Sequence, residues 1–343
     1  MARHLRLTVP SLALALLSHG LGAAGLRGQT LPAALTAERD ATRRHIRCEL
    51  ANASRRLGEA LQRWPGGKQV AWAPVNGTCA VVGSSGVLKL HAHGKEIDRS
   101  ARIFRFNDAP AGEGFNGFYS YMDMVGGRED LRIVNDAFPM KYLERSKRGE
   151  RPSKEPAAYL VMPISWPPIL PDLDEFAKAA GVRVYSLKPD AVLEAEKVMH
   201  SLFSAGWWSQ LGQSKLTPLG SPSSGLLGAL LAFSLCGETR LYGMPATRSG
   251  LTNEYHYYPS EENVEVPNAN SLNQHQGFRA EKYLFRLLAA NADLEASDVG
   301  VVEGLQSGRQ DCTNASSIAS AAATAPALPL PVDSWRRDFG TSD

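Results

Sequence analysis

The chain alternates short apolar runs with helical segments, and this pattern constrains its fold more than any other feature. Six apolar runs predict buried strands, at residues 79–83, 102–106, 131–134, 158–164, 182–187 and 239–243. Helices are predicted at residues 173–180, 190–203, 226–235 and 277–290. Strands that are apolar on both faces and alternate with helices are typical of a parallel sheet covered on both sides. The sequence therefore predicts an α/β fold with a mostly parallel central sheet flanked by helices.

A long amphipathic helix is predicted ahead of the first strand, at residues 37–64. Its apolar side chains recur at steps of three and four residues: Ile46, Leu50, Ala53, Leu57, Leu61 and Trp64. Arginines line the rest of its surface, which we interpret as a solvated face, and Pro65 with two glycines ends the helix. We assign residues 31–70 to a stem with this helix and residues 71–312 to the main folded domain.

Charge and cysteine content exclude some classes of protein. The 343 residues include 37 Lys and Arg against 35 Asp and Glu, a net charge of +2, so bulk charge does not favour nucleic acid as a partner. The four cysteines form no CxxC pair, so a zinc ribbon or knuckle is not expected.

The N-terminus has the features of a secretory targeting segment. Arg3 and Arg6 precede an apolar run at 7–17, and small residues follow at 20–25. Two interpretations fit residues 1–30: a signal peptide that is cleaved, or an uncleaved signal anchor. In both, the basic end stays in the cytosol and the remainder enters the secretory lumen.

Potential glycosylation sites agree with a lumenal location. Asn52, Asn76 and Asn314 each begin an Asn-x-Ser/Thr triplet without a central proline. Residues 313–343 are rich in Ala, Ser and Pro and are predicted to be a disordered tail.

Three patterns resemble ligand sites but have plainer explanations. Gly112–Gly117 matches GxGxxG, yet no helix start follows it, so a glycine loop is expected. Asp172 and Asp174 resemble a metal-binding DxD, but acidic residues in a first helical turn complement the helix dipole without a metal. His91 and His93 lack a nearby third ligand and are expected on the surface.

Four segments of the chain combine small, polar and cysteine residues in a distinctive order. The first comprises Cys79-Ala-Val-Val-Gly-Ser-Ser-Gly86, Ile97-Asp98 and Arg105-Phe-Asn107-Asp-Ala-Pro110. The second comprises Pro222-Ser-Ser-Gly225, Cys236 and Tyr242-Gly243. The third is His256-Tyr-Tyr258, and the last is His275 with Glu281. In this order and with similar spacing, the four segments resemble the long, short, third and last motifs of the eukaryotic sialyltransferases, and the resemblance covers about residues 75–290.

This resemblance implies a single Rossmann-like domain, a variant of the GT-A type, in a Golgi glycosyltransferase. The N-terminal segment would make it a single-pass type II membrane protein, or a protein of the secretory lumen if that segment is cleaved. The implied reaction moves sialic acid from CMP-sialic acid to a hydroxyl of a glycoprotein or glycolipid by a single inverting displacement, without a metal or other cofactor. The implied donor-binding residues are Ser84, Ser85, Asn107, Ser223, Ser224, Gly225, Gly243 and Tyr257.

These residue types suit an anionic nucleotide. A tight Ser-Ser-Gly loop after a buried strand exposes backbone N–H groups. Ser223 and Ser224 at a helix start offer hydroxyl and N–H groups to an anion, although a serine there also serves as a plain N-cap. Asn107 follows a strand, where open α/β sheets bind ligands, or it is a turn residue before Pro110.

The two histidines receive catalytic roles from the resemblance. His275 would be the general base that takes the proton from the acceptor hydroxyl, because a histidine titrates near neutral pH. His256 would hydrogen-bond the departing phosphate, where negative charge develops in the transition state.

The resemblance also implies a disulfide between Cys79 and Cys236, which would join the first strand to the apolar helix. A second hypothesis pairs Cys48 with Cys312. Against this second pairing, Cys48 lies off the apolar stripe, on the same polar face as Asn52.

The chain departs from the family pattern at three places. Ser84 replaces an asparagine, five residues rather than four separate His275 from Glu281, and Pro259 follows the third motif. Two alternatives to sialyl transfer therefore stay open: a transferase for another CMP-linked 3-deoxy acid sugar, and an inactive glycan- or nucleotide-binding protein. The sequence specifies neither the linkage, nor the acceptor, nor the oligomeric state.

Overall fold

A computed structural model describes the chain in separate ranges: residues 33–112, 120–150, 155–163, 173–204, 222–244, 255–259, 281–282, 284–286, 288–291 and 294–304. The chain divides into two compact units, Met1–Glu38 and Arg39–Asp343. In the first unit, residues 33–38 are helical. The other described residues belong to the second unit.

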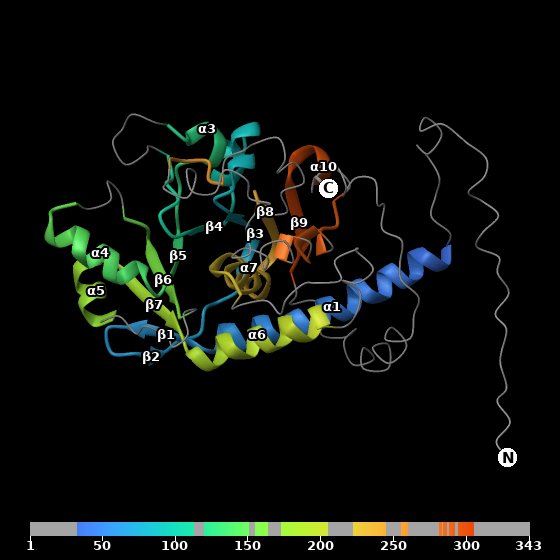
Figure 1. The fold of residues 1–343 in the computed structure, drawn as a ribbon, viewed down its shortest axis with the longest axis horizontal. Helices are drawn as coiled ribbons and strands as arrows, with labels where there is room; N and C mark the ends of the chain where they lie inside the picture. The colour runs from blue at the N-terminus through green and yellow to red at the C-terminus, as the bar shows by residue number, and fades with distance from the viewer. Residues whose placement is uncertain are drawn as a thin grey trace, which may run out of the picture. The chain divides into compact units, whose positions relative to one another are not determined.

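The described residues form a nine-stranded sheet, in the order β2-β1-β7-β6-β5-β4-β3-β8-β9 (Figure 1). Its strands are β1 (Leu61–Trp64), β2 (Lys68–Gln69), β3 (Val75–Val82), β4 (Arg102–Phe106), β5 (Leu131–Asn135), β6 (Ala158–Met162), β7 (Arg183–Leu187), β8 (Cys236–Tyr242) and β9 (Val299–Glu303). The six strands from β7 to β8 run parallel, and antiparallel strands close both ends. The prediction of a mostly parallel α/β sheet is confirmed.

Helices cover both faces of this sheet. The helices and single 3-10 helix of the described ranges are α1 (Ala33–Glu59), η1 (Gly86–Leu90), α2 (Gly94–Asp98), α3 (Met122–Val125), α4 (Phe138–Lys147), α5 (Leu173–Ala180), α6 (Pro189–Ser204), α7 (Ser224–Leu235) and α10 (Leu294–Ser297). The described residues between 281 and 288 are also helical. α1, α6, α7 and the helical residues Leu284, Phe285 and Leu288 pack into one core cluster, whereas η1, α2, α3, α4 and α5 pack in two clusters on the other face.

Residues 79–82 of β3 are apolar at every position because both faces of the strand are covered. Cys79 and Val81 belong to the core cluster with α7, and Ala80 and Val82 belong to the cluster with η1 and α2. Successive side chains of a strand point to opposite faces, so a strand covered on both sides favours apolar residues at successive positions. This burial is what made the six parallel strands recognisable in the sequence.

The predicted helix at 37–64 is wrong at its C-terminal end. α1 ends at Glu59, and Leu61 and Trp64 belong to β1, which pairs with β7. Without β1, the backbone of β7 would be unpaired at this edge of the sheet, and a sheet edge is stabilised by a partner strand. The other apolar residues of the stripe, from Ile46 to Leu57, are buried as predicted.

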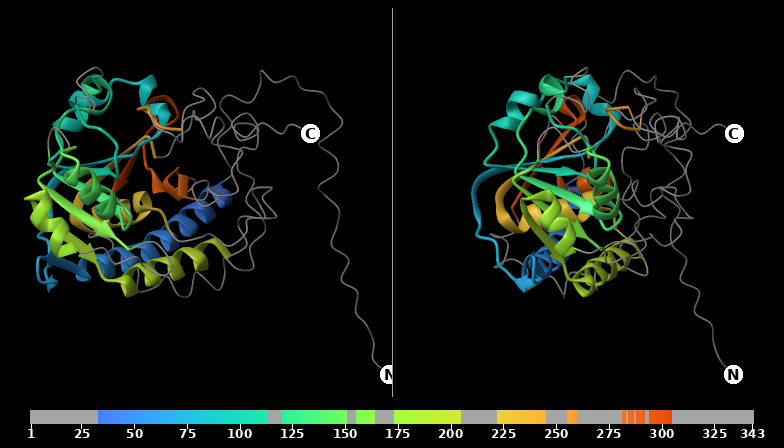
Figure 2. Two further views of the ribbon diagram at one scale, coloured as in Figure 1. Left: turned by 60° about the vertical axis from the view of Figure 1, so that its left-hand side comes forward. Right: turned by 90° about the vertical axis from the view of Figure 1, so that its left-hand side faces the viewer.

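The boundary of the predicted stem is also wrong. Ile46, Leu50 and Leu57 of α1 pack into the main core cluster, and β1 extends the central sheet. α1 lies beside α6 (Figure 2), where Arg56 and Glu194 are joined at 2.6 Å. The folded domain therefore includes the residues assigned to the stem from Arg39 onward.

The terminal segments lie outside the part of the chain that the structure describes. This applies to the targeting segment at 1–30, the tail at 313–343 and the acceptor Asn314. Asn52 and Asn76 are exposed, in α1 and β3. Among the described helices, none is long and apolar enough to cross a membrane.

Candidate functional site

Three of the predicted site segments meet at the carboxyl end of β3. The loop Ser84–Gly86 follows β3, and the third-motif segment 255–258 pairs with it through a bridge between Ser85 and His256. Gly86 N donates to Tyr255 O at 3.1 Å, and Tyr257 N donates to Ser84 O at 3.0 Å. The long and third motifs, which lie far apart in the sequence, therefore form one backbone-bonded unit.

The short motif reaches the same place through Met244. A Cβ atom at Gly83 would lie 3.1 Å from Met244 Cγ, and a Cβ atom at Gly225 would lie 3.4 Å from Met244 Cε. The side chain of Met244 thus lies between the end of β3 and the start of α7. Gly243 has a φ of 67°, and a Cβ atom there would approach Leu88 to 2.8 Å, so a larger residue does not fit.

His256 is held in a defined orientation. His256 is 9% exposed, and its ring stacks on the ring of Tyr258, with the two centroids 4.8 Å apart and the two planes inclined by 8°. His256 Nδ1 lies 3.3 Å from the backbone oxygen of Ser84. Because a carbonyl oxygen only accepts, Nδ1 must carry the hydrogen of this bond. The neutral ring then bears no hydrogen on Nε2, and only the imidazolium form can donate from that atom.

The side chain of Tyr257 is buried and bonded to a neighbouring segment of the site. It is 1% exposed, its hydroxyl donates to Pro110 O at 2.5 Å, and its ring packs edge-on against Tyr121. Burial raises the pKa of Tyr257, so the hydroxyl keeps its hydrogen. The side chain of Tyr257 thus connects the third motif to the loop after Asn107, and a donor-binding role of Tyr257 stays a prediction.

Asn107 lies where β4 ends and is bonded mainly to β5. Its Oδ1 accepts from Asn135 N at 3.1 Å, and Asn135 Oδ1 accepts in turn from Phe138 N at the start of α4. Within the described residues, nothing accepts the two hydrogens of the Asn107 amide nitrogen. The half-buried side chain can therefore donate to a ligand at the carboxyl end of the sheet.

The start of α7 is organised by Glu281. Ser223 is the N-cap, and its Oγ accepts from Leu226 N at 3.0 Å. Ser223 N and Ser223 Oγ donate to the two carboxylate oxygens of Glu281, at 2.8 and 2.5 Å. Both hydrogens of Ser223 are thus bonded to Glu281, so Ser223 stabilises this loop, and its predicted contact with the donor stays a prediction.

Ser224 and Gly225 retain free donors. Their backbone N–H groups lie in the first turn of α7, where a helix offers no internal acceptor. Within the described residues, the Ser224 hydroxyl has no hydrogen-bond partner either. Together with the positive end of the helix dipole, these groups suit an anion.

Glu281 is buried, and its burial raises the pKa of its carboxyl group. It is 7% exposed, and burial raises its pKa from the ordinary value of 4.5 to about 7, although the bonds from Ser223 act in the opposite direction. The five-residue spacing from His275 does not remove Glu281 from the site: it contacts the short motif directly.

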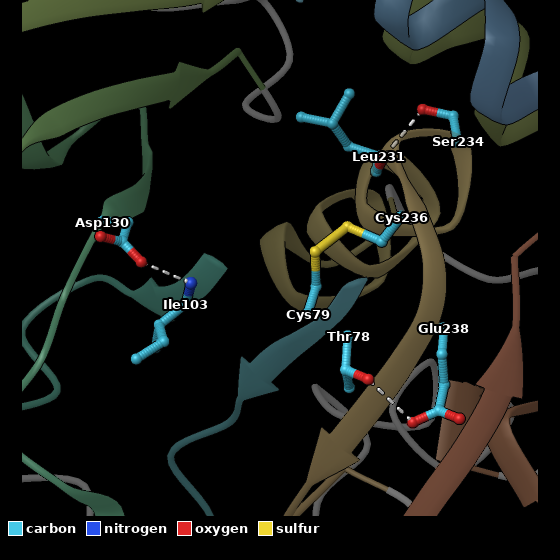
Figure 3. Close-up of a disulfide and its surroundings, with 8 residues drawn as sticks. All are labelled: Thr78, Cys79, Ile103, Asp130, Leu231, Ser234, Cys236 and Glu238. Carbon is cyan, nitrogen blue, oxygen red and sulfur yellow. Dashed lines mark hydrogen bonds between the residues drawn. A yellow bond between two sulfur atoms is a disulfide. The ribbon is translucent and has the colours of Figure 1, made fainter. Parts of the chain in front are cut away.

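A disulfide links β3 to the start of β8, as predicted. Cys79 of β3 and Cys236, at the junction of α7 and β8, are bonded with their Cα atoms 6.0 Å apart (Figure 3). Close by, Thr78 donates to Glu238 at 3.2 Å, which adds a side-chain link between β3 and β8. The bridge therefore joins the strand of the long motif to the helix of the short motif.

The second disulfide hypothesis is tested only at one end. Cys48 is disulfide-bonded and 6% exposed, so it does not lie on a polar face of α1 as the sequence suggested. Cys312 lies outside the described residues, and its pairing with Cys48 stays a prediction.

His275 also lies outside the described residues, so its role as the general base stays a prediction.

The three ligand-like patterns behave differently. Asp174 Oδ1 accepts from Gly66 N at 3.1 Å and lies in the first turn of α5, as expected for a helix start; Asp172 is outside the described residues. His91 and His93 are half-buried rather than fully exposed: His91 pairs with the buried Asp298 at 2.8 Å, and His93 bonds Ser297 O. Within the described residues, no group of three or more His, Cys, Asp or Glu could hold a metal. Most of the glycine loop at 112–117 is outside them.

Comparisons with known proteins agree with this arrangement of motifs. The sequence model of glycosyltransferase family 29 (sialyltransferase) matches residues 54–292. A beta-galactoside alpha-2,6-sialyltransferase 2 of Danio rerio is 31% identical over 193 residues, covering 53% of this chain and 35% of the relative. The protein of the same name from Bos taurus is 28% identical over 255 residues, covering 68% of this chain and 45% of the relative. The chain thus spans less than half the length of these relatives.

A crystal structure of a mammalian sialyltransferase in complex with Gal-beta-1-3GalNAc-ortho-nitrophenol is also similar. It aligns with a TM-score of 0.37 and 16% identity, over 76% of this chain and 85% of that one. The family model spans well over half of the sequence, and the chain therefore belongs to glycosyltransferase family 29, the sialyltransferases.

Proposed function

We propose that the protein transfers sialic acid from CMP-sialic acid to a hydroxyl group of a glycan. The observation that carries this proposal is the meeting of the long, short and third motifs at the carboxyl end of β3. Free donors face no protein partner there in the described residues: the Asn107 amide, the Ser224 hydroxyl and the first N–H groups of α7. A nucleoside monophosphate is the kind of leaving group that such donors bind.

The chemistry of the step follows from these donors. In a single displacement, the acceptor oxygen attacks the anomeric carbon while the bond from that carbon to the phosphate oxygen breaks. Negative charge grows on the phosphate, and preorganised N–H and O–H donors stabilise it most in the transition state. The configuration at the anomeric carbon inverts because attack and departure occur on opposite faces.

His256 supplies charge in this proposal. With Nδ1 bonded to the Ser84 carbonyl, the ring donates from Nε2 only as the imidazolium. A cationic donor beside the phosphate supplies positive charge that a metal ion supplies in other nucleotide-sugar transferases. We therefore propose a metal-independent reaction. The opposite task, removal of the acceptor proton, is proposed for His275.

The acceptor and the compartment are also proposals. The names of the relatives specify beta-galactosides and alpha-2,6 linkage, so galactosides are the first acceptors to test. The Cys79–Cys236 disulfide suits an oxidising compartment. We therefore propose the Golgi lumen, with the N-terminal segment as anchor or cleaved signal.

One experiment tests the proposed function and its two alternatives. The full chain is incubated with CMP-sialic acid, with and without a galactoside, and CMP and sialylated product are measured by mass spectrometry. Product formation supports sialyl transfer. CMP binding without release of CMP from CMP-sialic acid would instead support an inactive binding protein, and turnover of only a different CMP-linked 3-deoxy acid sugar would reassign the donor.

A further inference from the structure

Asn107 adopts a left-handed backbone conformation that hydrogen bonds to neighbouring residues hold in place. Its φ is 44°, in the left-handed region that side-chain-bearing residues other than Asn and Asp rarely adopt. Three of its polar groups are bonded: N donates to Ile133 O at 2.9 Å, Oδ1 accepts from Asn135 N, and O accepts from Arg132 Nη1 at 2.6 Å. Arg132 is thus the only side chain among these partners, and a substitution can remove it.

Arg132 is itself fixed by Glu129. Arg132 Nε and Nη2 donate to the two carboxylate oxygens of Glu129, each at 2.6 Å, and the side chains are only 12% and 7% exposed. Such a two-point bond sets the plane of the guanidinium as well as its position. The third guanidinium nitrogen, Nη1, is then aimed at Asn107 O.

The pair also balances charge in a crowded region. Arg105 of β4 lies in register with Arg132 of β5 and is fully buried, with its guanidinium bonded to the carbonyls of Val125 and Arg128. Burial lowers the pKa of Arg105, whereas Glu129, against the effect of burial, keeps the pKa of Arg132 raised. Glu129 is therefore the carboxylate that balances the charge of Arg132 and fixes its position beside a second cation.

We propose that Arg132 and Glu129 are positioning residues for the sugar-nucleotide donor: their ion pair holds Asn107 in the left-handed conformation in which its amide hydrogens remain free for the donor. The proposal rests on the proposed function, because it assigns those hydrogens to CMP-sialic acid. Neither Arg132 nor Glu129 needs to contact the donor. Their effect passes through the backbone carbonyl of Asn107.

The test compares CMP binding in a double-mutant cycle. Arg132→Lys keeps the charge but loses the planar fork, so the Kd for CMP, measured by titration calorimetry, should rise about tenfold or more, the value of one hydrogen bond to an anion. Asn107→Gly keeps the backbone conformation and removes the amide, and should weaken CMP binding similarly. In the Asn107→Gly background, Arg132→Lys should have little further effect, because its target is gone.

A merely structural role predicts a different pattern. Arg132→Lys would then lower the melting temperature and the fraction of active protein while leaving the Kd for CMP and the KM for CMP-sialic acid unchanged. Glu129→Gln should reproduce the Arg132→Lys effect on Kd, and its neutral side chain provides a second variant if the first does not fold. Arg148→Lys is the matched control, because it breaks a similar two-point bond to Glu150 at an exposed position.

The outcomes separate this inference from the proposed function. If the unaltered protein neither binds CMP nor turns over CMP-sialic acid, the proposed function fails. If it does both, and Arg132→Lys and Glu129→Gln bind CMP as the unaltered protein does, the function stands and the positioning role is refuted. Equal losses from Arg132→Lys with and without Asn107→Gly would also refute it.

Discussion

Glu281 accepts both hydrogens of Ser223, the backbone N–H at 2.8 Å and the hydroxyl at 2.5 Å. The same hydroxyl oxygen accepts from Leu226 N and so caps α7. A carboxylate from the last motif therefore sets the first turn of the helix that carries the short motif. Its buried position gives this contact a dependence on pH.

Stability should fall as Glu281 loses its proton. Its pKa in the folded chain is about 7, above the ordinary value of 4.5. The folded state therefore binds the proton more tightly, and this contribution is fully present below pH 4.5 and lost as the pH rises through about 7. The loss is on the order of 3 kcal/mol between those limits.

Urea unfolding at a series of pH values measures this effect. Glu281→Gln cannot titrate, so the difference in unfolding free energy between the unaltered protein and the variant should shrink or reverse as the pH rises from 5 to 8. Other titrating groups cancel in this difference. A difference that does not change with pH would show that Glu281 has an ordinary pKa.

Substitutions of the two histidines should have different effects on kcat and on CMP binding. His275→Ala should lower kcat by about 10²–10⁴, the usual contribution of a general base, and leave CMP binding nearly unchanged. Rapid-quench kinetics and CMP titration of this variant measure the two quantities separately. Unaltered turnover in His275→Ala would rule out the base role.

His256 should affect both chemistry and nucleotide binding. His256→Ala loses a donor to the phosphate and should lower kcat and weaken CMP binding together. His256→Gln is the informative second variant, because its amide can donate without positive charge. If His256→Gln retains full activity, the imidazolium form is not required and the charge assigned to the ring is wrong.

The disulfide should contribute strongly to stability. Cys79 and Cys236 are separated by 157 positions in the sequence. For a loop of this length, the loss of loop entropy in the unfolded chain stabilises the folded state by about 4–5 kcal/mol. Replacing either cysteine by alanine opens the same loop, so each single variant and the double variant should lose a similar amount in urea unfolding. A double variant with the stability of the unaltered chain would contradict this prediction.

The sequence predicts the central sheet well because burial on both faces leaves a local signal. β4 and α5 have the predicted bounds, Arg102–Phe106 and Leu173–Ala180. β1 was missed because Leu61 and Trp64 also fit the helical spacing that precedes them. β9 was missed because Val299–Glu303 is a short segment whose strand character depends on pairing with β8.

The site was predictable as a set of motifs but not as a set of contacts. The resemblance to a family placed Asn107, His256 and the start of α7 in one site. It did not indicate that Glu281 would take both hydrogens of Ser223, or that Tyr257 would bond Pro110 O. These contacts join residues that are far apart in sequence, and only the packed chain brings them together. Another contact of the site had a signal in the sequence: Asn135, which bonds Asn107, is a polar residue directly after the strand predicted at 131–134.

Turnover should not depend on a metal ion at the DxD sequence, Asp172 to Asp174. Asp174 Oδ1 accepts from Gly66 N at 3.1 Å, and asparagine offers the same carbonyl oxygen to that N–H group. The double variant Asp172→Asn/Asp174→Asn should therefore keep its turnover of CMP-sialic acid, and EDTA should not inhibit the unaltered protein. A metal-binding DxD would give the opposite result, because removing both carboxylate charges greatly weakens binding of a divalent cation. Strong EDTA inhibition that added Mg²⁺ or Mn²⁺ reverses, with loss of activity in the double variant, would establish a metal site and overturn the assignment of leaving-group stabilisation to His256, Asn107 and α7 alone.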